Sequence, residues 1–262
     1  MIRLQGRAAL YGDVWFDEEP PVDTDVDIVR YHCRPTPLAS ARCVAFLSMT
    51  TNLRVDTGSL SEAFSKDCRY KIRRADSKDN LVMECITDPE PRLAEFCAFF
   101  DEFARQKSHE ASDRQWLHAA CKAGQLLLTS ASRNGEILVW HAHLLCGSAT
   151  WLQYSGSCFR DKQTDYRSLV GRANRWLHWK DMLWFKEMGV SRYDWGGLFQ
   201  DESTPERAGI NAFKKSFGGT IEQSYECIVP MTVKGRVYLP LRDAWHSGKS
   251  VFSSRRASVE SA

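Results

Sequence analysis

The sequence predicts a single α+β domain in which helices cover both faces of a mixed, mostly antiparallel sheet, with a short β extension at the N-terminus. A chain of 262 residues with 43% hydrophobic residues can bury a sizeable core. Period-two segments typical of strands alternate with longer segments whose apolar residues follow helical spacing. Two strands separated by the longest helix predict one parallel pair within the sheet.

The first half predicts irregular strands followed by three helices. The first helix is expected to begin at Ser59, which has capping-box spacing to Glu62. The third is expected to begin at Ser112 and to end at Gly124. In order, the predicted elements are strand-like pieces at 25–31 and 43–47, a helix at 59–75, a strand at 81–86, a helix opening at 88–91 and a helix at 112–124.

The second half predicts a meander, then a long helix and two more strands. Asn134-Gly135 is a strong hairpin signal between two strand-like segments. Thr204-Pro205 begins a helix, and Gly189 is expected to end the longest helix in a left-handed conformation. The predicted elements are strands at 126–130, 137–144 and 149–154, a helix at 168–188, a strand at 191–195, a helix from 204 to 217 and a strand at 221–229.

Charge and cysteine usage exclude several classes of protein. The formal net charge is only +2, so the chain as a whole is not a basic nucleic-acid-binding surface. No apolar run approaches the roughly 20 residues that span a bilayer, and residues 1–13 contain no apolar core of a signal peptide. The nine cysteines form no CxxC pair, so we expect small buried thiols in a cytoplasmic protein, with neither a disulfide framework nor a zinc knuckle.

Three motifs resemble the FemAB-like branch of the GNAT acyltransferases, which includes FemX and BioF2-like acetyltransferases. They are Arg69-Tyr-Lys-Ile-Arg-Arg-Ala75, Tyr193-Asp-Trp-Gly-Gly197 and Asn211-Ala-Phe-Lys-Lys-Ser-Phe-Gly-Gly219. The resemblance implies one GNAT-like domain at 49–248, preceded by a strand-like extension at 1–48 and followed by a frayed tail at 249–262. Well-studied peptidoglycan-building members carry two such halves, whereas this chain has room for one.

The resemblance also implies where a donor would bind. Two parallel strands, here 149–154 and 191–195, would diverge and hold the amide-bearing arm of the donor. Residues 168–173 overlay the glycine and the final alanine of the GNAT pyrophosphate loop, and a helix starting near Ser168 would offer free N–H groups to phosphate. The donor-binding residues implied are Arg167, Ser168, Gly171, Arg172 and Phe213. An ordinary helix start with solvated arginines is the alternative.

Three residues are candidates for the catalytic chemistry. His141 shares a strand face with His143 and can act as a general base, because histidine titrates near neutral pH. Asp194 ends a short strand and can accept a hydrogen bond from the acceptor amine. By resemblance, Lys214 would neutralise developing negative charge. No carboxylate or cysteine stands at ligand spacing from the two histidines, so no metal site is predicted.

Acceptor binding is assigned to a second group of residues. Arg69 and Arg73 lie one helical turn apart and can bind a phosphate or carboxylate; the alternative is a solvated helix face. His178 and Asp181, three residues apart on the longest helix, can meet as a structural pair or as part of a proton relay. Tyr154 at the end of its strand completes the set.

The leading function is transfer of an acyl group from an acyl-CoA or acyl carrier protein to an amine of a sugar or amino-acid-like acceptor, in cell-surface polysaccharide or secondary-metabolite biosynthesis. We expect no tightly bound cofactor, no DNA partner and no transmembrane segment. One alternative is a FemX-like transferase that uses aminoacyl-tRNA, which the balanced charge disfavours. The other is an inactive GNAT-like binding module.

Overall fold

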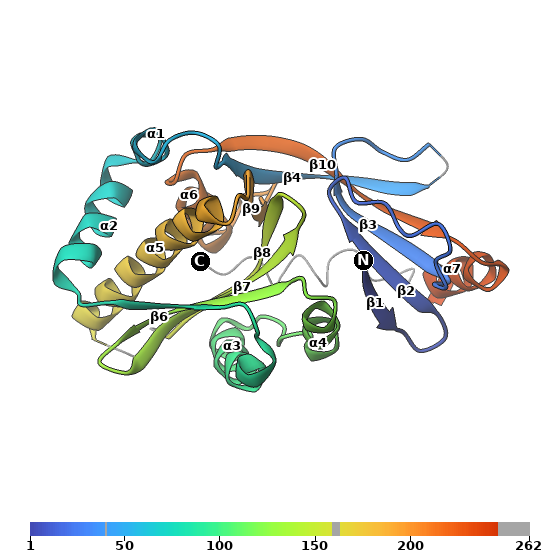
Figure 1. Ribbon diagram of the computed structural model, residues 1–262, viewed down its shortest axis with the longest axis horizontal. Coiled ribbons are helices and arrows are strands. Elements are labelled where there is room, and N and C mark those ends of the chain that lie inside the picture. The colour runs from blue at the N-terminus through green and yellow to red at the C-terminus, as the bar shows by residue number, and fades with distance from the viewer. Residues whose placement is uncertain (40, 159–162, 246–262) are drawn as a thin grey trace.

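The computed structural model describes residues 1–39, 41–158 and 163–245, and it contains one mixed ten-stranded sheet with helices on both faces (Figure 1). The strand order is β1-β2-β3-β10-β4-β9-β8-β7-β6-β5. Only β2–β3 and β8–β9 pair in parallel. The α+β class and the mostly antiparallel sheet are therefore confirmed.

The strands are β1 (Ile2–Gln5), β2 (Leu10–Trp15), β3 (Ile28–Arg34), β4 (Arg42–Asn52), β5 (Val82–Ile86), β6 (Leu126–Arg133), β7 (Glu136–Cys146), β8 (Ala149–Ser157), β9 (Arg192–Gly197) and β10 (Thr220–Pro230). The helices are α1 (Thr57–Glu62), α2 (Lys66–Lys78), a 3₁₀ turn η1 (Glu90–Arg92), α3 (Leu93–Lys107), α4 (Arg114–Lys122), α5 (Thr164–Glu187), α6 (Pro205–Lys215) and α7 (Val233–Trp245).

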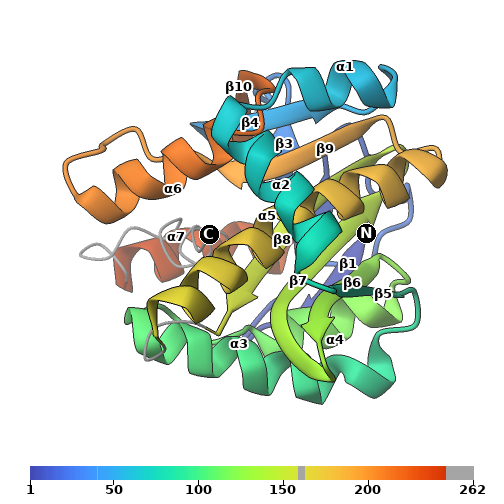
Figure 2. The same cartoon turned by 90° about the vertical axis from the view of Figure 1, so that its left-hand side faces the viewer.

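Two helical layers bury the two faces of the sheet (Figure 2). The 24-residue helix α5 crosses one face over β6, β7 and β8, and α2 packs against α5. Helices α3 and α4 cover the other face. Along β7 every residue from Leu138 to Leu144 is buried, because the strand has a helical layer on each side.

The parallel pair β8–β9 separates part of the way along its length. Only Ala149, Thr150 and Trp151 of β8 have partners on β9, whereas β8 continues to Ser157 and β9 continues to Gly197. Beyond that point β8 remains paired with β7, and β9 with β4. The two central strands therefore diverge, as the sequence analysis expects for residues 149–154 and 191–195.

The N-terminal strands belong to the same sheet as the rest of the chain. Strand β10 pairs with β3 on one side and β4 on the other, so the last strand joins β1–β3 to the remainder. Strand β4 crosses residue 48, where the sequence analysis places the end of the extension. The division at residues 48 and 248 stays a prediction, and the tail at 249–262 lies outside the described residues.

Several helix boundaries differ from those expected, and side-chain caps explain most of them. Asp56, rather than Ser59, caps α1 by accepting from the Ser59 N–H at 3.0 Å. The expected helix at 59–75 is divided, because Ser65 caps a second helix, α2. Asp113, rather than Ser112, caps α4. Helix α5 begins at Thr164, one turn before the expected Ser168.

Two cysteines form a disulfide that the sequence analysis does not expect. Cys43 on β4 lies directly opposite Cys227 on β10, and the two sulfurs are bonded across 184 residues of chain. The expectation of nine free thiols is wrong for this pair, because their proximity arises only from sheet register. Disulfides are uncommon in a reducing cytoplasm, so the cytoplasmic location stays a prediction.

A buried charge network connects the N-terminal strands to α4 and β10. Asp13 accepts from Arg30 at 2.5 and 2.9 Å and from the Trp116 indole at 3.2 Å. His32 lies 2.6 Å from the Glu226 carboxylate. Burial opposes charge on His32, but the carboxylates of Glu226 and Asp13 outweigh it and raise the pKa of His32 to about 9.

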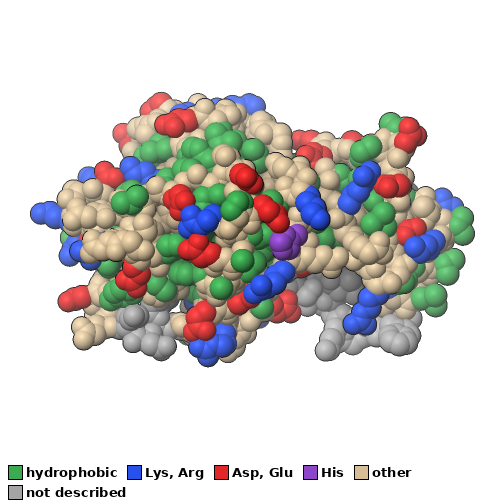
Figure 3. All heavy atoms as spheres, turned by 60° about the horizontal axis from the view of Figure 1, so that its bottom comes forward, with side chains coloured by type: hydrophobic (Ala, Val, Ile, Leu, Met, Phe, Trp, Pro, Cys, Tyr) green, Lys and Arg blue, Asp and Glu red, His purple; other side chains and the backbone are tan. Residues whose placement is uncertain are grey.

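On the face shown in Figure 3, which is the lower side of Figure 1, basic and acidic side chains are interspersed. Within the described part of the chain, no helix combines the length and the apolar character needed to cross a bilayer.

Candidate active site

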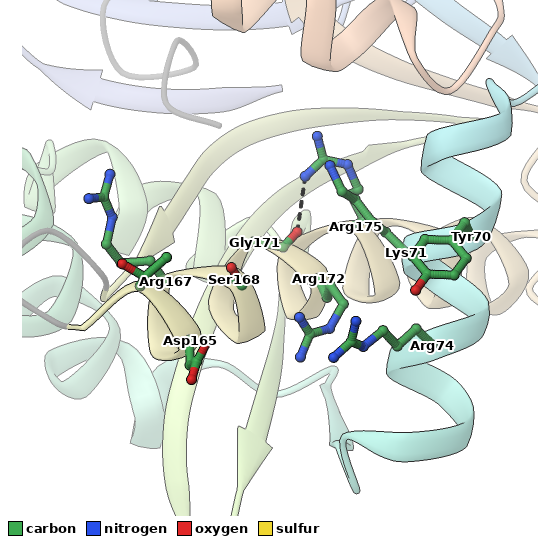
Figure 4. A pocket seen from close by; sticks show the side chains of 10 residues that line it. Tyr70, Lys71, Arg74, Asp165, Arg167, Ser168, Gly171, Arg172 and Arg175 are labelled. Carbon is green, nitrogen blue, oxygen red and sulfur yellow. Dashed lines mark hydrogen bonds between the residues drawn. The ribbon is translucent and has the colours of Figure 1, made fainter.

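Two adjoining cavities lie beside the first half of α5. The basic cavity, of about 850 Å³, lies between α5 and α2 (Figure 4). The strand-end cavity, of about 610 Å³, lies between α5, α6 and Ser157, the last residue of β8. Arg167, Gly171 and Arg175 line both, so one face of α5 forms the shared wall. The second cavity lies beyond the point where β8 and β9 diverge.

The basic cavity contains cations without carboxylate partners. It is lined by Tyr70, Lys71, Arg74, Thr164, Asp165, Arg167, Ser168, Gly171, Arg172 and Arg175. Arg172 is paired with Asp79 through two hydrogen bonds of 2.6 and 2.8 Å, and Lys71 is paired with Asp67. Among the described residues, neither Arg74, Arg167 nor Arg175 has such a partner. The cavity therefore presents uncompensated positive charge.

Arg175 is the least solvated of these cations. Its guanidinium donates to the Gly171 carbonyl at 3.1 Å and lies 4.8 Å from the centre of the Phe213 ring. Its Nε is buried with no hydrogen-bond partner among the described residues. Burial lowers the pKa of Arg175, although arginine stays charged. An anionic group in either cavity would compensate this charge.

The expected phosphate loop is instead a helix interior. Because α5 begins at Thr164, the backbone N–H of Arg167 already bonds to Gln163, and Ser168 and Gly171 lie one and two turns into the helix. The expectation of free N–H groups at Ser168 is therefore wrong. The first turn lies earlier, where Thr164 lines the basic cavity and the side chain of the N-cap residue Gln163 makes no capping hydrogen bond.

A network of buried polar side chains lies beneath the strand-end cavity. His141 Nδ1 is 2.6 Å from Asp181 Oδ2, and His143 Nε2 is 3.2 Å from the same oxygen. His141 Nε2 is 2.9 Å from Asn174 Oδ1. His178 Nδ1 is 3.2 Å from the Tyr193 hydroxyl. These side chains come from α5, β7 and β9, and of them only Asn174 lines either of the two cavities.

The pKa values of three groups in this network are shifted. Burial alone would raise the pKa of Asp181, but the nearby charges and hydrogen bonds of His143 and His141 hold it below its ordinary range. Burial lowers the pKa of His143, and it lowers that of His178 still further. His143 and His178 are therefore neutral at pH 7.

The same cluster is compact enough to raise the question of a metal ion. One ligand atom each of His141, His178 and Asp181 lies within 4.8 Å of the others. However, the His141 and His178 rings are stacked, with centroids 4.1 Å apart and planes 29° apart. Because imidazole lone pairs lie in the ring plane, stacked rings direct them side by side rather than toward one ion. The arrangement favours a hydrogen-bonded network.

The other two candidate catalytic residues lie apart from the cavities. Neighbours along β9 point to opposite faces, so Asp194 points away from the side that Tyr193 shares with α5. Asp194 binds Arg192 at 2.9 Å and Ser48 at 3.3 Å, and burial raises its pKa despite Arg192. Lys214 is buried and donates to the Gly197 carbonyl at 2.7 Å. In this structure both residues hold β9 in place.

The candidate acceptor residues are not brought together. Arg69 donates to the Glu62 carbonyl, and Arg73 is exposed on α2. The face of α2 that lines the basic cavity carries Tyr70, Lys71 and Arg74 instead. Tyr154 is buried against α3, where its hydroxyl accepts from the Asp113 N–H. His178 and Asp181 belong to the buried network.

The sequence analysis missed Asn174 and Arg175, although a signal for them was present. Arg167, Gly171 and Arg175 follow the four-residue spacing of one helix face, and Asn174 lies three residues after Gly171. Of the implied donor-binding residues, four line the basic cavity and Phe213 lines the strand-end cavity. Their roles toward a donor stay predictions.

A sheet that opens at a central parallel pair, with a long helix and a cavity beside the opening, is the architecture expected of an acyltransferase. The chain belongs to the family described as acetyltransferase (GNAT) domain, whose family model matches residues 62–215. No curated protein matches the sequence.

Solved structures show the same fold at low sequence identity. A structure of FemX aligns with a TM-score of 0.57 and 14% identity, over 73% of this chain and 63% of that one. The C-terminal domain of a putative lysylphosphatidylglycerol synthetase from Agrobacterium fabrum aligns with a TM-score of 0.52 and 12% identity, over 84% of this chain and 72% of that one. This chain thus spans less than two thirds of the FemX structure, and these likenesses show the fold alone.

Proposed function

We propose that the protein transfers an acyl group from a thioester donor, an acyl-CoA or an acyl carrier protein, to an amine of a sugar or amino-acid-like acceptor, in cell-surface polysaccharide or secondary-metabolite biosynthesis. The observation that carries this proposal is the pair of adjoining cavities on α5. Uncompensated arginines line the one between the helices, and the other begins where β8 and β9 diverge.

The two cavities match the two ends of such a donor. The diphosphate and 3′-phosphate of coenzyme A would bind to Arg167 and Arg175, because phosphate accepts bidentate hydrogen bonds from a guanidinium. The pantetheine arm would then pass Gly171 into the strand-end cavity. There the acceptor amine attacks the thioester carbonyl, the C–S bond breaks, and the thiolate leaves with a proton from the amine.

Calorimetric titration with coenzyme A and acetyl-CoA tests the donor. We expect wild-type protein to bind both, and Arg175→Gln to weaken binding at least tenfold, because a charge-assisted hydrogen bond contributes about 1.5–3 kcal/mol. Arg105→Gln is the matched control, since Arg105 is exposed on α3 and lines neither cavity. Absence of binding at millimolar coenzyme A, or equal affinity in Arg175→Gln, would contradict the proposal.

A second candidate is transfer from aminoacyl-tRNA. The unpaired cations would also accept the phosphates of a tRNA end, and Phe213 lines the adjoining cavity under Arg175. Binding of charged tRNA would weaken steeply with salt, because each neutralised phosphate releases counterions. This candidate would be favoured if the wild-type protein retained charged tRNA on a filter, Arg175→Gln abolished the retention, and the protein did not bind coenzyme A. Binding without transfer to any acceptor would leave an inactive binding module.

A further inference from the structure

Asn174 is the one member of the buried network that lines either of the two cavities, and its side-chain amide contacts the network through its oxygen. Its side-chain oxygen lies 2.9 Å from His141 Nε2, and the other imidazole nitrogen lies 2.6 Å from Asp181. His141 and Asp181 are 0% exposed, whereas Asn174 retains 4% exposure and lines the strand-end cavity. A substrate in that cavity can touch Asn174 but neither of the two residues behind it.

The structure places the Asn174 oxygen toward His141 Nε2, and hydrogen-bond chemistry then sets the protons of that ring. An ionised carboxylate only accepts, so His141 Nδ1 carries a proton toward Asp181. An amide oxygen also only accepts, so Nε2 carries a second proton toward Asn174. His141 is then an imidazolium ion, and its charge cancels that of Asp181.

The other titratable groups of the network are consistent with this assignment. His143 lies 3.2 Å from the same Asp181 oxygen, His178 stacks on His141, and the Tyr193 hydroxyl bonds to His178. Among the described residues of this network, Asp181 is the one acid. A single imidazolium ion, on the histidine closest to it, leaves the buried cluster neutral, which avoids the cost of an uncompensated charge.

With its oxygen held by His141, Asn174 directs its amide nitrogen the other way. That nitrogen has no hydrogen-bond partner among the described residues. We propose that Asn174 is a catalytic residue whose side-chain N–H stabilises the oxyanion formed during acyl transfer, and that His141 and Asp181 are positioning residues that hold this N–H in place.

The proposal rests on the proposed acyl transfer and assigns one part of it. When the amine nitrogen attacks the thioester carbonyl, the carbon–oxygen π electrons move onto oxygen and form an oxyanion. Asn174 donates a hydrogen bond to this oxygen. The oxyanion then reforms the carbonyl, the C–S bond breaks, and the thiolate takes the proton released by the amine. His141 keeps both of its protons throughout, which differs from the general-base role predicted from the sequence.

The orientation can be tested without any substrate. Nitrogen-15 NMR of histidine-labelled full-length protein should show one imidazole with both nitrogens protonated whose signals disappear in His141→Gln. A His141 ring with an unprotonated Nε2 would overturn the proposal, because Asn174 would then have to donate to that nitrogen and present its oxygen to the cavity.

Kinetics test the role, with acetyl-CoA as donor, hydroxylamine as a small amine and free thiol as readout. Asn174→Ala and the isosteric Asn174→Asp should lower kcat about 10²- to 10³-fold, as loss of one oxyanion donor does, with acetyl-CoA affinity unchanged. His141→Gln should lower kcat in the wild-type background but have no further effect in Asn174→Ala, since His141 acts through Asn174.

The outcomes separate this inference from the proposed function. Unchanged kcat in both Asn174 variants, or additive losses in the double variant, would overturn the role of Asn174 while leaving acyl transfer intact. A wild-type protein that neither binds acetyl-CoA nor releases thiol would overturn the proposed function, and the NMR experiment would still decide how Asn174 is oriented.

Discussion

Replacing Gly171 by alanine should stabilise the protein and weaken donor binding at the same time. Gly171 lies inside α5, and a Cβ built on it meets no atom within 4 Å. Glycine inside a helix costs about 0.5–1 kcal/mol relative to alanine, so the free energy of unfolding should rise by about that amount. For a domain of this size the gain corresponds to a Tm increase of roughly 2–4 °C.

The same methyl group would project into the wall that the two cavities share. If the donor passes over Gly171, the methyl group should cost about 1–3 kcal/mol of overpacking, or roughly 5- to 150-fold in Kd. Thermal unfolding measures the first effect, and calorimetric titration with acetyl-CoA measures the second. Because the variant should be more stable but should bind the donor more weakly, weaker binding could not be attributed to a damaged fold.

Gly209→Ala is the matched control for this experiment. Gly209 also lies inside a helix, α6, has open space around its Cβ direction and lines only the strand-end cavity. We expect Gly209→Ala to stabilise the protein by the same amount. Its affinity for 3′-phospho-ADP, which carries the phosphates of coenzyme A without the pantetheine arm, should be unchanged. A destabilised Gly171→Ala, or one that binds acetyl-CoA as tightly as wild type, would refute the reasoning.

Three further predictions concern stability. The pKa of His32 is raised to about 9, so its contribution to stability should be complete below pH 6.5 and should be lost as the pH rises through 9. In urea unfolding the loss should lower the free energy of unfolding by about 3 kcal/mol. His32→Gln should abolish this pH dependence of stability. Asp79→Asn breaks a largely buried ion pair with Arg172 and should lower the free energy of unfolding by about 3 kcal/mol in the same assay. A decrease of less than about 1 kcal/mol, which is typical of exposed ion pairs, would contradict this prediction. Cys43→Ser should lower the free energy of unfolding by about 2–5 kcal/mol, because its bond to Cys227 closes a 184-residue loop; an unreduced protein that shows two free thiols by mass spectrometry would contradict this.

Local signals in the sequence predicted most of the elements. Asn134-Gly135 specified the hairpin, and both residues adopt the positive φ that its turn requires. Thr204-Pro205 specified the start of α6, where Thr204 is the cap. Errors arose where neighbouring residues compete for one cap, as with Asp113 and Ser112. Strands β1 and β2 were expected only as part of a strand-like extension at 1–48, and helix α7 was missed, because their burial comes from distant partners rather than from a strong local pattern.

The candidate site was predicted only where it follows one helix. Arg167, Ser168, Gly171 and Arg172 could be identified together because they are close in sequence and share a helix. Asp194 and Lys214 were assigned to the catalytic group, yet they lie in buried contacts that hold β9. A sequence does not show which face of a short central strand points toward the cavity, since both faces are buried.

By itself the sequence determined the α+β class, the order of strands and helices between residues 80 and 230 and the presence of a basic helix face on α5, because each of these depends on interactions within a few residues. Only the tertiary structure determined that His141 lies behind Asn174, that Cys43 meets Cys227 and that β8 and β9 pair only at Ala149, Thr150 and Trp151 of β8. These features depend on which strands become neighbours in the sheet and in what register, and contacts between residues tens to hundreds of positions apart decide both.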